Sequence, residues 1–339
     1  MEKELTIVGG GLAGLSLGAA LSARGVPVTV REAGVLPRHR VCGEFICGVR
    51  RATLRRLGVE PDLADALVHR RATWRGPSGR VFYRCGLPRE ALGLSRHALD
   101  WRLAGRIRAN GGTVRLGERW RGDPEAEGVV LASGRVAART DWMGFKLHIR
   151  GGLPPDLTLF LGEGGYVGLS PVEGGFWNLC GLFRKRPEVR AGRGRILAAY
   201  ARAAGMEAVV RLLADSEIRP DSAAAVAGVS FALPRTPDGS LRLGDAWGVI
   251  PPFTGNGMSI AFESAETALD PLLAWHRGEA EWRAVVRRVG AEHSKRFRRR
   301  FRIANAIHPL LLRPGLRAGL RVAAAGRMVP FRTLFALTH

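Results

Sequence analysis

The chain has 339 residues, enough to bury a large core as one complex domain or two. Of its 52 basic residues only four are Lys, which leaves 48 Arg spread along the chain without a DNA-binding motif. We therefore attribute the net charge of +22 to a compositional bias and expect no nucleic-acid partner. The lack of a long uncharged apolar run argues against a transmembrane helix, and the four cysteines lack the spacing of a zinc site, so no metal is expected. The chain leads straight into a strand with no signal peptide before it, which predicts a cytoplasmic protein with reduced thiols.

The N-terminal stretch predicts a strand, a glycine-rich loop and a helix. Residues 5–8 are apolar, and the next six fit G-x-G-x-x-G with Gly9, Gly11 and Gly14 in register. Gly9 allows a tight turn, and Gly11 lets a pyrophosphate approach the backbone at the start of the helix. Gly14 lets that helix pack closely against the strand.

A second predicted strand, over residues 26–30, is followed by Glu32. A carboxylate at this distance from the glycine loop can accept the ribose hydroxyls of an adenosine. Strand, loop, helix, strand and acid stand in the expected order, which favours a dinucleotide site over a simple glycine-rich turn.

The middle of the chain alternates between the two element types. Residues 35–48 form a loop that mixes glycines and cysteines with apolar and basic residues. The elements predicted after it are helices at 50–57 and 61–68, a hairpin at 71–83, a helix at 97–110, and strands at 113–116 and 128–132.

From residue 144 the pattern becomes typical of a mostly antiparallel sheet with one covered face. Its predicted strands are 145–149, 157–161, 166–172 and 176–182, followed by helices at 194–204 and 206–214. Strand character returns at 226–233 and 241–243, before a helix at 257–273 and helical residues at 279–339. We therefore expect a discontinuous nucleotide-binding domain (1–68, 94–143, 226–275), an inserted sheet domain (69–93, 144–225) and a C-terminal helical cap (276–339).

A second motif runs from Leu243 to Met258. Asp245 follows a glycine at a strand end and can accept a ribityl hydroxyl. The two prolines at 251–252 stiffen a loop that can run beside a flat ring. The loop ends in Gly-Asn-Gly at 255–257, where backbone N–H groups at the start of a helix can bind an anionic ring edge.

Together these motifs resemble the FAD-dependent group that contains the para-hydroxybenzoate hydroxylase type monooxygenases, the flavin halogenases and the geranylgeranyl reductases. The resemblance covers the fingerprint with Glu32, the loop at 40–44, the segment at 94–96 with its helix, and the block at 244–257. It implies an α/β fold: a glutathione-reductase-type, Rossmann-like FAD-binding domain with an inserted, mostly antiparallel sheet domain and a C-terminal helical region. The cofactor-binding residues it implies are Gly9, Gly11, Leu12, Ala13, Gly14, Glu32, Arg40, Arg96, Asp245, Gly255, Asn256, Gly257 and Met258.

The sequence departs from the family patterns in ways that bear on the reaction. Ser133 stands where many aromatic hydroxylases have Asp, Trp247 stands where they often have His, and the Trp-x-Trp-x-Ile motif of the halogenases is absent. Cys42 and Gly43 resemble the geranylgeranyl reductases. We expect a monooxygenase that uses NAD(P)H and O₂ on a small lipophilic molecule. The alternatives are a flavin-dependent reductase of isoprenoid or quinone double bonds, and a flavin redox module without its own substrate.

Three residues are candidates for catalysis: Cys42, Glu44 and His148. Each has a structural alternative, since Cys42 can be an inert buried thiol and Glu44 can merely fix its loop. Lys146 and His148 share one side of a strand. If that side faces the pocket, they can orient a phenolate or carboxylate of the substrate; the expected alternative is a solvated face. The expected substrate wall is apolar and combines Phe45, Phe145, Tyr166, Leu169, Pro251 and Phe253, which favours a hydrophobic substrate.

The C-terminal part is basic and amphipathic. Residues 283–302 are rich in Arg, and apolar stretches follow at 310–312 and 316–329. We expect a helical cap with a solvated Arg face, and contact with an anionic membrane stays open as the alternative.

Overall fold

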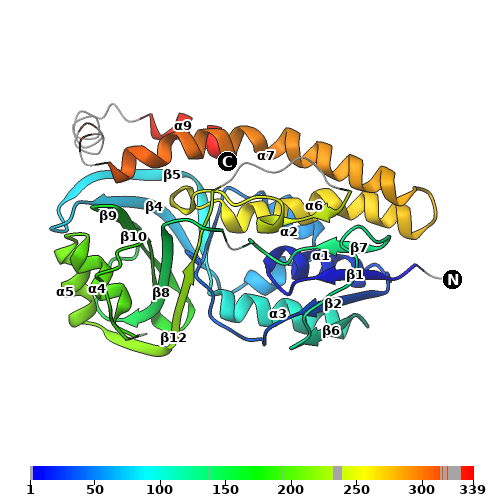
Figure 1. The fold of residues 1–339 in the computed structure, drawn as a ribbon, viewed down its shortest axis with the longest axis horizontal. Coiled ribbons are helices and arrows are strands. Elements are labelled where there is room, and N and C mark those ends of the chain that lie inside the picture. The colour runs from blue at the N-terminus through cyan, green and yellow to red at the C-terminus, as the bar shows by residue number, and fades with distance from the viewer. Residues whose placement is uncertain are drawn as a thin grey trace.

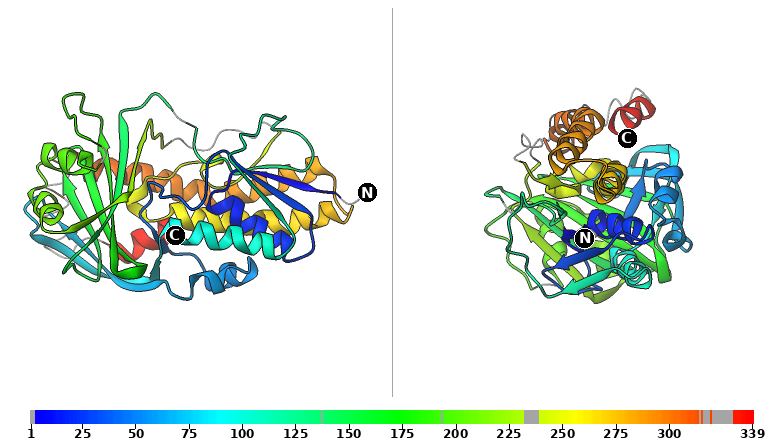
Figure 2. Two further views of the ribbon diagram at one scale, coloured as in Figure 1. Left: turned by 90° about the horizontal axis from the view of Figure 1, so that it is seen from below. Right: turned by 90° about the vertical axis from the view of Figure 1, so that its right-hand side faces the viewer.

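The structure is a computed structural model that describes residues 3–136, 138–192, 194–231, 239–313, 315, 319 and 330–339. It contains two sheets that lie side by side along the long axis of the molecule (Figure 1). The N-terminal strand belongs to the smaller sheet, and the long helix α7 (Trp282–Leu312) runs over both of them (Figures 1 and 2).

The smaller sheet is parallel throughout, as expected from the βαβ pattern of its sequence. Its order is β13-β7-β1-β2-β6. The strands are β1 (Leu5–Val8), β2 (Val28–Glu32), β6 (Thr113–Leu116), β7 (Val129–Leu131) and β13 (Leu241–Arg242). Since ligands of such sheets bind beyond the carboxyl ends of the strands, this order directs attention to the loops after β1, β2 and β13.

Three helices pack beside this sheet and around one another: α1 (Leu12–Ser22), α3 (Arg96–Ala109) and α6 (Gly257–His276). All eleven residues of α1 are buried, because the helix consists of Leu, Gly and Ala with two small Ser residues, carries no charge, and lies between the sheet, α3 and α6. Their apolar side chains and those of the sheet form one continuous core.

The larger sheet has eight strands in the order β12-β8-β11-β10-β9-β4-β5-β3. Its pairs are antiparallel except β4 with β9. The strands are β3 (Phe45–Cys47), β4 (Leu67–Arg75), β5 (Val81–Gly93), β8 (Trp142–Arg150), β9 (Leu157–Gly162), β10 (Gly165–Val172), β11 (Phe176–Arg184) and β12 (Glu217–Ala227). Helices α4 (Ile196–Ala203) and α5 (Glu207–Ala214) cover one face with an apolar core, so the opposite face is left for the loop after β2.

Helix α7 contacts three separate cores along its length. Its first turns join the core of the parallel sheet, its middle packs Phe297 and Phe301 against Ile250 and Ile260, and its last residues reach β9 and β10. Helix α9 (Phe331–Thr338) returns to pack against α7 and β5. The short helix α2 (Arg51–Arg56) lies beside α6, and 3-10 turns occupy Glu60–Leu63, Glu173–Gly175, Gly244–Ala246 and Pro252–Thr254.

Several predicted elements differ from the structure. The helix expected at 61–68 is only a 3-10 turn, and β4 begins within that range at Leu67. The hairpin at 71–83 is correct in kind, but β5 continues to Gly93. The strand expected at 226–233 is wrong in place: β12 ends at Ala227, and residues 232–233 lie outside the described residues. Most of the apolar stretch at 316–329 also lies outside them.

None of the helices in the described part of the chain combines the length and the apolar character that crossing a bilayer requires.

Candidate functional site

The glycine loop after β1 has two glycines that serve packing and one that faces open space. A Cβ on Gly9, at φ +116°, would lie 2.3 Å from the carbonyl oxygen of Ala132, and a Cβ on Gly14 would lie 2.2 Å from that of Gly9. A Cβ on Gly11 would meet only the Ala132 oxygen, at 3.9 Å. No side chain caps the N-terminus of α1 and no acidic residue lies in its first turn. The N–H groups of Leu12 and its neighbours therefore offer an anion site.

Glu32 is buried and fastens the glycine loop to the loop after β2. Its carboxylate accepts hydrogen bonds from the Gly10 N–H (2.9 Å) and the Gly34 N–H (2.8 Å), and it pairs with Arg38 and Arg40. Burial alone would raise the pKa of Glu32, but these N–H groups and arginines together hold that pKa below its ordinary value. Both oxygens are occupied, so a ribose hydroxyl would have to displace an arginine contact.

Arg40 and Arg96 meet on Asp100, a buried acid of α3 that the sequence reasoning missed. Asp100 accepts from Arg40 Nε at 3.0 Å and from Arg96 at 2.8 and 2.9 Å. Arg40 also donates to the Gly10 carbonyl at 2.8 Å. The i, i+4 spacing of Arg96 and Asp100 in a helix was the available signal. The network extends from the glycine loop to the N-terminus of α3.

The Gly244–Met258 block lies against the start of α1. A Cβ on Gly244 would lie 3.0 Å from the Cβ of Ala13, which places Asp245 beside the helix terminus. The Asp245 side chain is accessible to water, yet the surrounding protein desolvates it enough to raise its pKa, against the charges of Arg96 and Arg135.

At the N-terminus of α6, Asn256 is fully buried, and neither polar atom of its side chain has a hydrogen-bond partner in the described structure. A Cβ on Gly257 would meet nothing within 4 Å, while the buried Met258 anchors the first turn of the helix. Buried polar atoms without partners are uncommon in proteins, so this terminus is suited to hold a polar ligand.

These residues fit FAD. An uncapped helix terminus with an open Gly11 suits the pyrophosphate, an accessible Asp245 beside it suits a hydroxylated chain, and the unpartnered Asn256 with the open Gly257 suits a polar ring edge.

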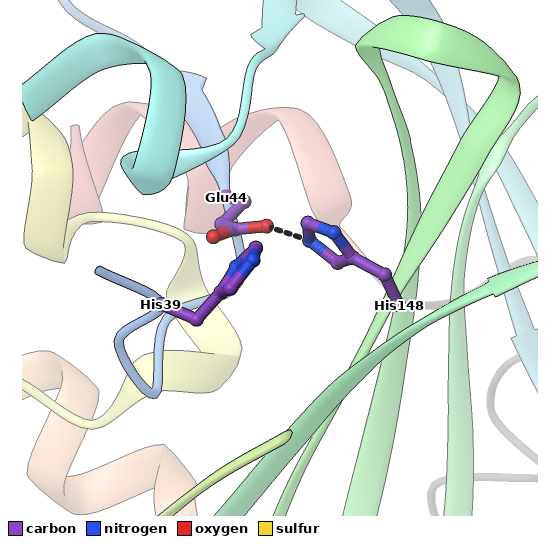
Figure 3. Close-up of side chains that lie close together, drawn as sticks. All are labelled: His39, Glu44 and His148. Atoms are coloured by element: carbon purple, nitrogen blue, oxygen red, sulfur yellow. Dashed lines mark hydrogen bonds and ion pairs between the residues drawn. The ribbon is translucent and has the colours of Figure 1, made fainter. Parts of the chain in front are cut away.

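A buried charged cluster joins the loop after β2 to the larger sheet (Figure 3). Lys146 Nζ lies 2.9 Å from both Glu44 Oε1 and His39 Nδ1, and His148 Nε2 lies 2.6 Å from Glu44 Oε2. The side chains of Lys146 and Glu44 have no exposed area. Burial would raise the pKa of Glu44, but the His148 hydrogen bond and the Lys146 charge outweigh it and keep the pKa low. Burial, together with the Lys146 charge, lowers the pKa of His39 to about 3, so His39 is neutral.

The solvated face expected for Lys146 and His148 is therefore wrong. Both side chains point from β8 toward the loop at 42–44, and that loop covers them. In β8 the apolar side chains at 145, 147 and 149 face α4 and α5, so the alternate positions necessarily face the loop.

Side chains of the larger sheet hold three successive residues of this loop. Asn178 donates to the Cys42 carbonyl at 2.9 Å, Ser170 donates to the Gly43 carbonyl at 2.6 Å, and Lys146 donates to Glu44. Glu44, at φ +56°, is the one non-glycine residue among those described that has a positive φ. Such a conformation persists only where surrounding contacts impose it, and the side-chain contacts of Glu44 supply them.

The spacing of His39, Glu44 and His148 would also suit a metal ion, because one donor atom from each lies within 4.8 Å of the others. The ammonium group of Lys146, however, is 2.9 Å from two of these donors. A cation already serves the carboxylate, and a second one would be repelled by it.

The expected substrate wall is divided between the two faces of the larger sheet. Phe145 and Leu169 belong to the core under α4 and α5, so they lie on the wrong face and the prediction for these two is corrected. Phe45 contacts the loops on both sides, since a Cβ on Gly43 or Gly255 would lie 2.9 or 2.5 Å from its ring.

The remaining wall candidates are Tyr166, Phe253 and Pro251. Tyr166 and Phe253 belong to one apolar cluster on the loop side of the sheet. Pro251, two residues before Phe253 in the sequence, is buried as well. Of the catalytic candidates, Cys42 is half-buried beside Arg96, and burial raises the pKa of its thiol. It is therefore not an activated thiolate.

No protein-family model and no curated protein matches the sequence. Solved structures do match. Klebsiella pneumoniae HpxO, complexed with FAD and uric acid, superposes with a TM-score of 0.77 at 19% identity, over 99% of this chain and 95% of that one. The p-nitrophenol 4-monooxygenase PnpA from Pseudomonas putida DLL-E4 superposes with a TM-score of 0.73 at 15% identity, over 99% of this chain and 97% of PnpA. The flavin-dependent brominase Bmp2 superposes with a TM-score of 0.69 at 19% identity, over 96% of this chain and 94% of Bmp2. The expected fold is thereby confirmed: the chain has the fold of these three proteins.

Proposed function

We propose that the chain is an FAD-dependent oxidoreductase that acts as a monooxygenase on a small lipophilic molecule. The observation that carries the proposal is the juxtaposition of an uncapped α1 N-terminus, an open Gly11 and an accessible Asp245 next to Ala13. The shared fold with structures solved with FAD supports it.

In this proposal the N–H groups at 11–14 bind the pyrophosphate of FAD, and Asp245 accepts from its ribityl chain. Arg40 and Arg96, fixed by Asp100, hold the glycine loop and the start of α3 in place. Asn256 and Gly257 meet the edge of the isoalloxazine ring, and Glu32 fixes the loops around the adenosine ribose. Bound FAD would supply two-electron redox chemistry, with NAD(P)H as the transient donor and O₂ as co-substrate.

The chain's own part is to orient the substrate and to position the loop at 42–44 beside it. Phe45, Tyr166, Pro251 and Phe253 are proposed as the apolar wall, without Phe145 and Leu169. Glu44 and His148 are engaged in the buried cluster, so we assign them the positioning of this loop. HpxO was solved with uric acid, and PnpA is named a p-nitrophenol 4-monooxygenase; both molecules are small and planar, a shape that fits between aromatic side chains.

No observation in the structure favours double-bond reduction or a redox module without a substrate. A cytoplasmic location and contact of the basic C-terminal helices with a membrane stay predictions.

The test begins with the purified protein, which should be yellow or become so with added FAD. Gly11→Ala should weaken FAD binding at least tenfold, because a methyl group stands where the pyrophosphate approaches and strains nothing in the fold. Gly105→Ala is the matched control, since a Cβ on Gly105 would meet nothing within 4 Å, so it is as easily accommodated as one on Gly11, but Gly105 lies on α3 away from the site. A colourless protein that FAD cannot reconstitute would contradict the proposal.

A second experiment distinguishes a monooxygenase from a reductase. Incorporation of ¹⁸O from ¹⁸O₂ into the product indicates a monooxygenase, whereas reduction of the substrate in the absence of oxygen indicates a reductase.

A further inference from the structure

A groove of about 900 Å³ lies apart from the proposed FAD residues, among α2, β5, α6, α7 and α9. Among the described residues, seven arginines and four acidic residues line it. In Figure 1 these helices form the upper part of the molecule, and the C-terminus lies among them. None of the residues assigned to FAD is among the described lining residues; strand β3 and the first turn of α6 adjoin the groove wall, where Ser259 donates to the Cys47 carbonyl just before Gly48.

Part of this charge is neutralised within the wall. Glu263 is buried on α6 and accepts from Arg300 at 2.6 Å, with Arg296 at 3.5 Å. Arg296 also pairs with Glu266 at 3.1 Å. One turn further along α6, Arg56 pairs with Asp270. Three of the acids are thus matched by three of the arginines.

The other four arginines have no carboxylate partner among the described residues: Arg50, Arg89, Arg288 and Arg332. They are exposed and come from the start of α2, from β5, from α7 and from α9. Of the acids that the described part of the chain contributes to the lining, Glu292 alone remains unmatched. Guanidinium groups from four elements that are distant in sequence therefore converge on one groove, with a surplus of positive charge.

We propose that this groove binds a molecule that carries two or more phosphate groups, of the size of a nucleotide or a coenzyme. A guanidinium group matches the geometry of a phosphate with two parallel hydrogen bonds. The volume is larger than a single phosphate needs, and the four arginines without a carboxylate partner come from four different elements, so the ligand spreads its negative charge over the groove. The matched acids on α6 hold Arg296 and Arg300 in place, while the other four arginines have no carboxylate partner among the described residues.

The experiment is calorimetric titration of the FAD-saturated protein, so that α1 does not compete for the phosphate, with inorganic pyrophosphate, NADPH and coenzyme A. Arg50→Ala, Arg288→Ala and Arg332→Ala should each weaken pyrophosphate binding about tenfold, the usual effect of losing a charge-assisted hydrogen bond. The matched control is Arg202→Ala, which removes an exposed arginine of α4 at the other end of the molecule and should change binding less than twofold.

The outcomes separate the sources of phosphate. Tighter binding of NADPH identifies a nucleotide, tighter binding of coenzyme A identifies a coenzyme-linked molecule, and binding of both no tighter than pyrophosphate identifies the phosphates alone. Absence of saturable binding, or equal losses in Arg202→Ala and the groove variants, would overturn the inference. Failure of the protein to bind FAD would overturn the proposed function instead, and the comparison of the arginine variants would still report on the groove.

Discussion

Replacement of Lys146 by Met tests how the buried charged cluster maintains the loop at 42–44. Met keeps most of the side-chain volume but removes the ammonium group that lies 2.9 Å from Glu44. Loss of one partner of a buried ion pair costs about 3–5 kcal/mol, because the other charge remains buried. Glu44 keeps its contact with His148 and the Arg96 N–H, at 2.6 and 3.1 Å, so we expect the lower end, about 3 kcal/mol.

The assay is urea denaturation followed by fluorescence, with the transitions compared between variants because a chain with two sheets need not unfold in one step. Lys185→Met is the control, since Lys185 is exposed and forms no ion pair among the described residues. The double variant Lys146→Met with Glu44→Gln removes both charges and should recover much of the loss.

The pKa of Glu44 determines how the stability difference between wild type and Lys146→Met changes with pH. In the wild type the pKa of Glu44 lies below its unfolded value of 4.5, so the stability it contributes is complete above that value and is lost as the pH falls through the folded pKa. Without Lys146, Glu44 is expected to take up a proton more readily. The difference between wild type and Lys146→Met should therefore shrink as the pH is lowered from 7 to 4. A difference below about 1 kcal/mol, or one that does not depend on pH, would refute the reasoning.

Two further predictions concern the cofactor residues. Gly14→Ala should lower the melting temperature by several degrees even without FAD, because its Cβ would lie 2.2 Å from the Gly9 carbonyl oxygen. An unchanged melting temperature would show that α1 can move away from this oxygen. Asn256→Ala removes two buried polar atoms that have no partners, so the apo protein should be at least as stable as the wild type. The same variant should bind FAD more weakly, as measured by quenching of the FAD fluorescence. A destabilised apo protein would show instead that Asn256 has a structural role.

Local patterns predicted the parts of the fold that depend on neighbouring residues. The parallel strands and α1 follow from a glycine loop between apolar strands, and β6 was predicted at its observed bounds. The predicted place of β12 was wrong because Pro220 and Asp221 interrupt its pattern, and the strand exists by pairing with β8 across an irregularity between Arg219 and Ala224. No local rule describes such a pairing.

The charged cluster shows the same limit within the site. Lys146 and His148 were recognised as sharing one side of a strand, but which side is buried depends on where α4 and α5 pack. Glu44 comes from a loop about a hundred residues earlier, so its meeting with Lys146 depends on the tertiary fold. For the same reason Phe145 and Leu169 were assigned to the wrong face: alternation separates the two faces of a strand but does not say which of them is covered by helices.

Helix α7 connects the two sheets of the molecule by packing against both of them. With 31 residues it is about 45 Å long, and it is fastened at its start to the parallel sheet, at its middle to the 250–260 region and at its end to β9 and β10. Pro309 lies within α7 just before its last attachment, and the helix before it resists bending, so a hinge-like opening of the two sheets would have to bend α7 near Pro309 or detach one of these three points. Admission of a substrate and release of a product would then fall to the shorter segments on the opposite side, where the loop at 42–44 meets the larger sheet. Enzymes that exchange ligands through such a loop can have turnover limited by its motion. In this chain that motion would be governed by the side chains that hold three successive loop residues.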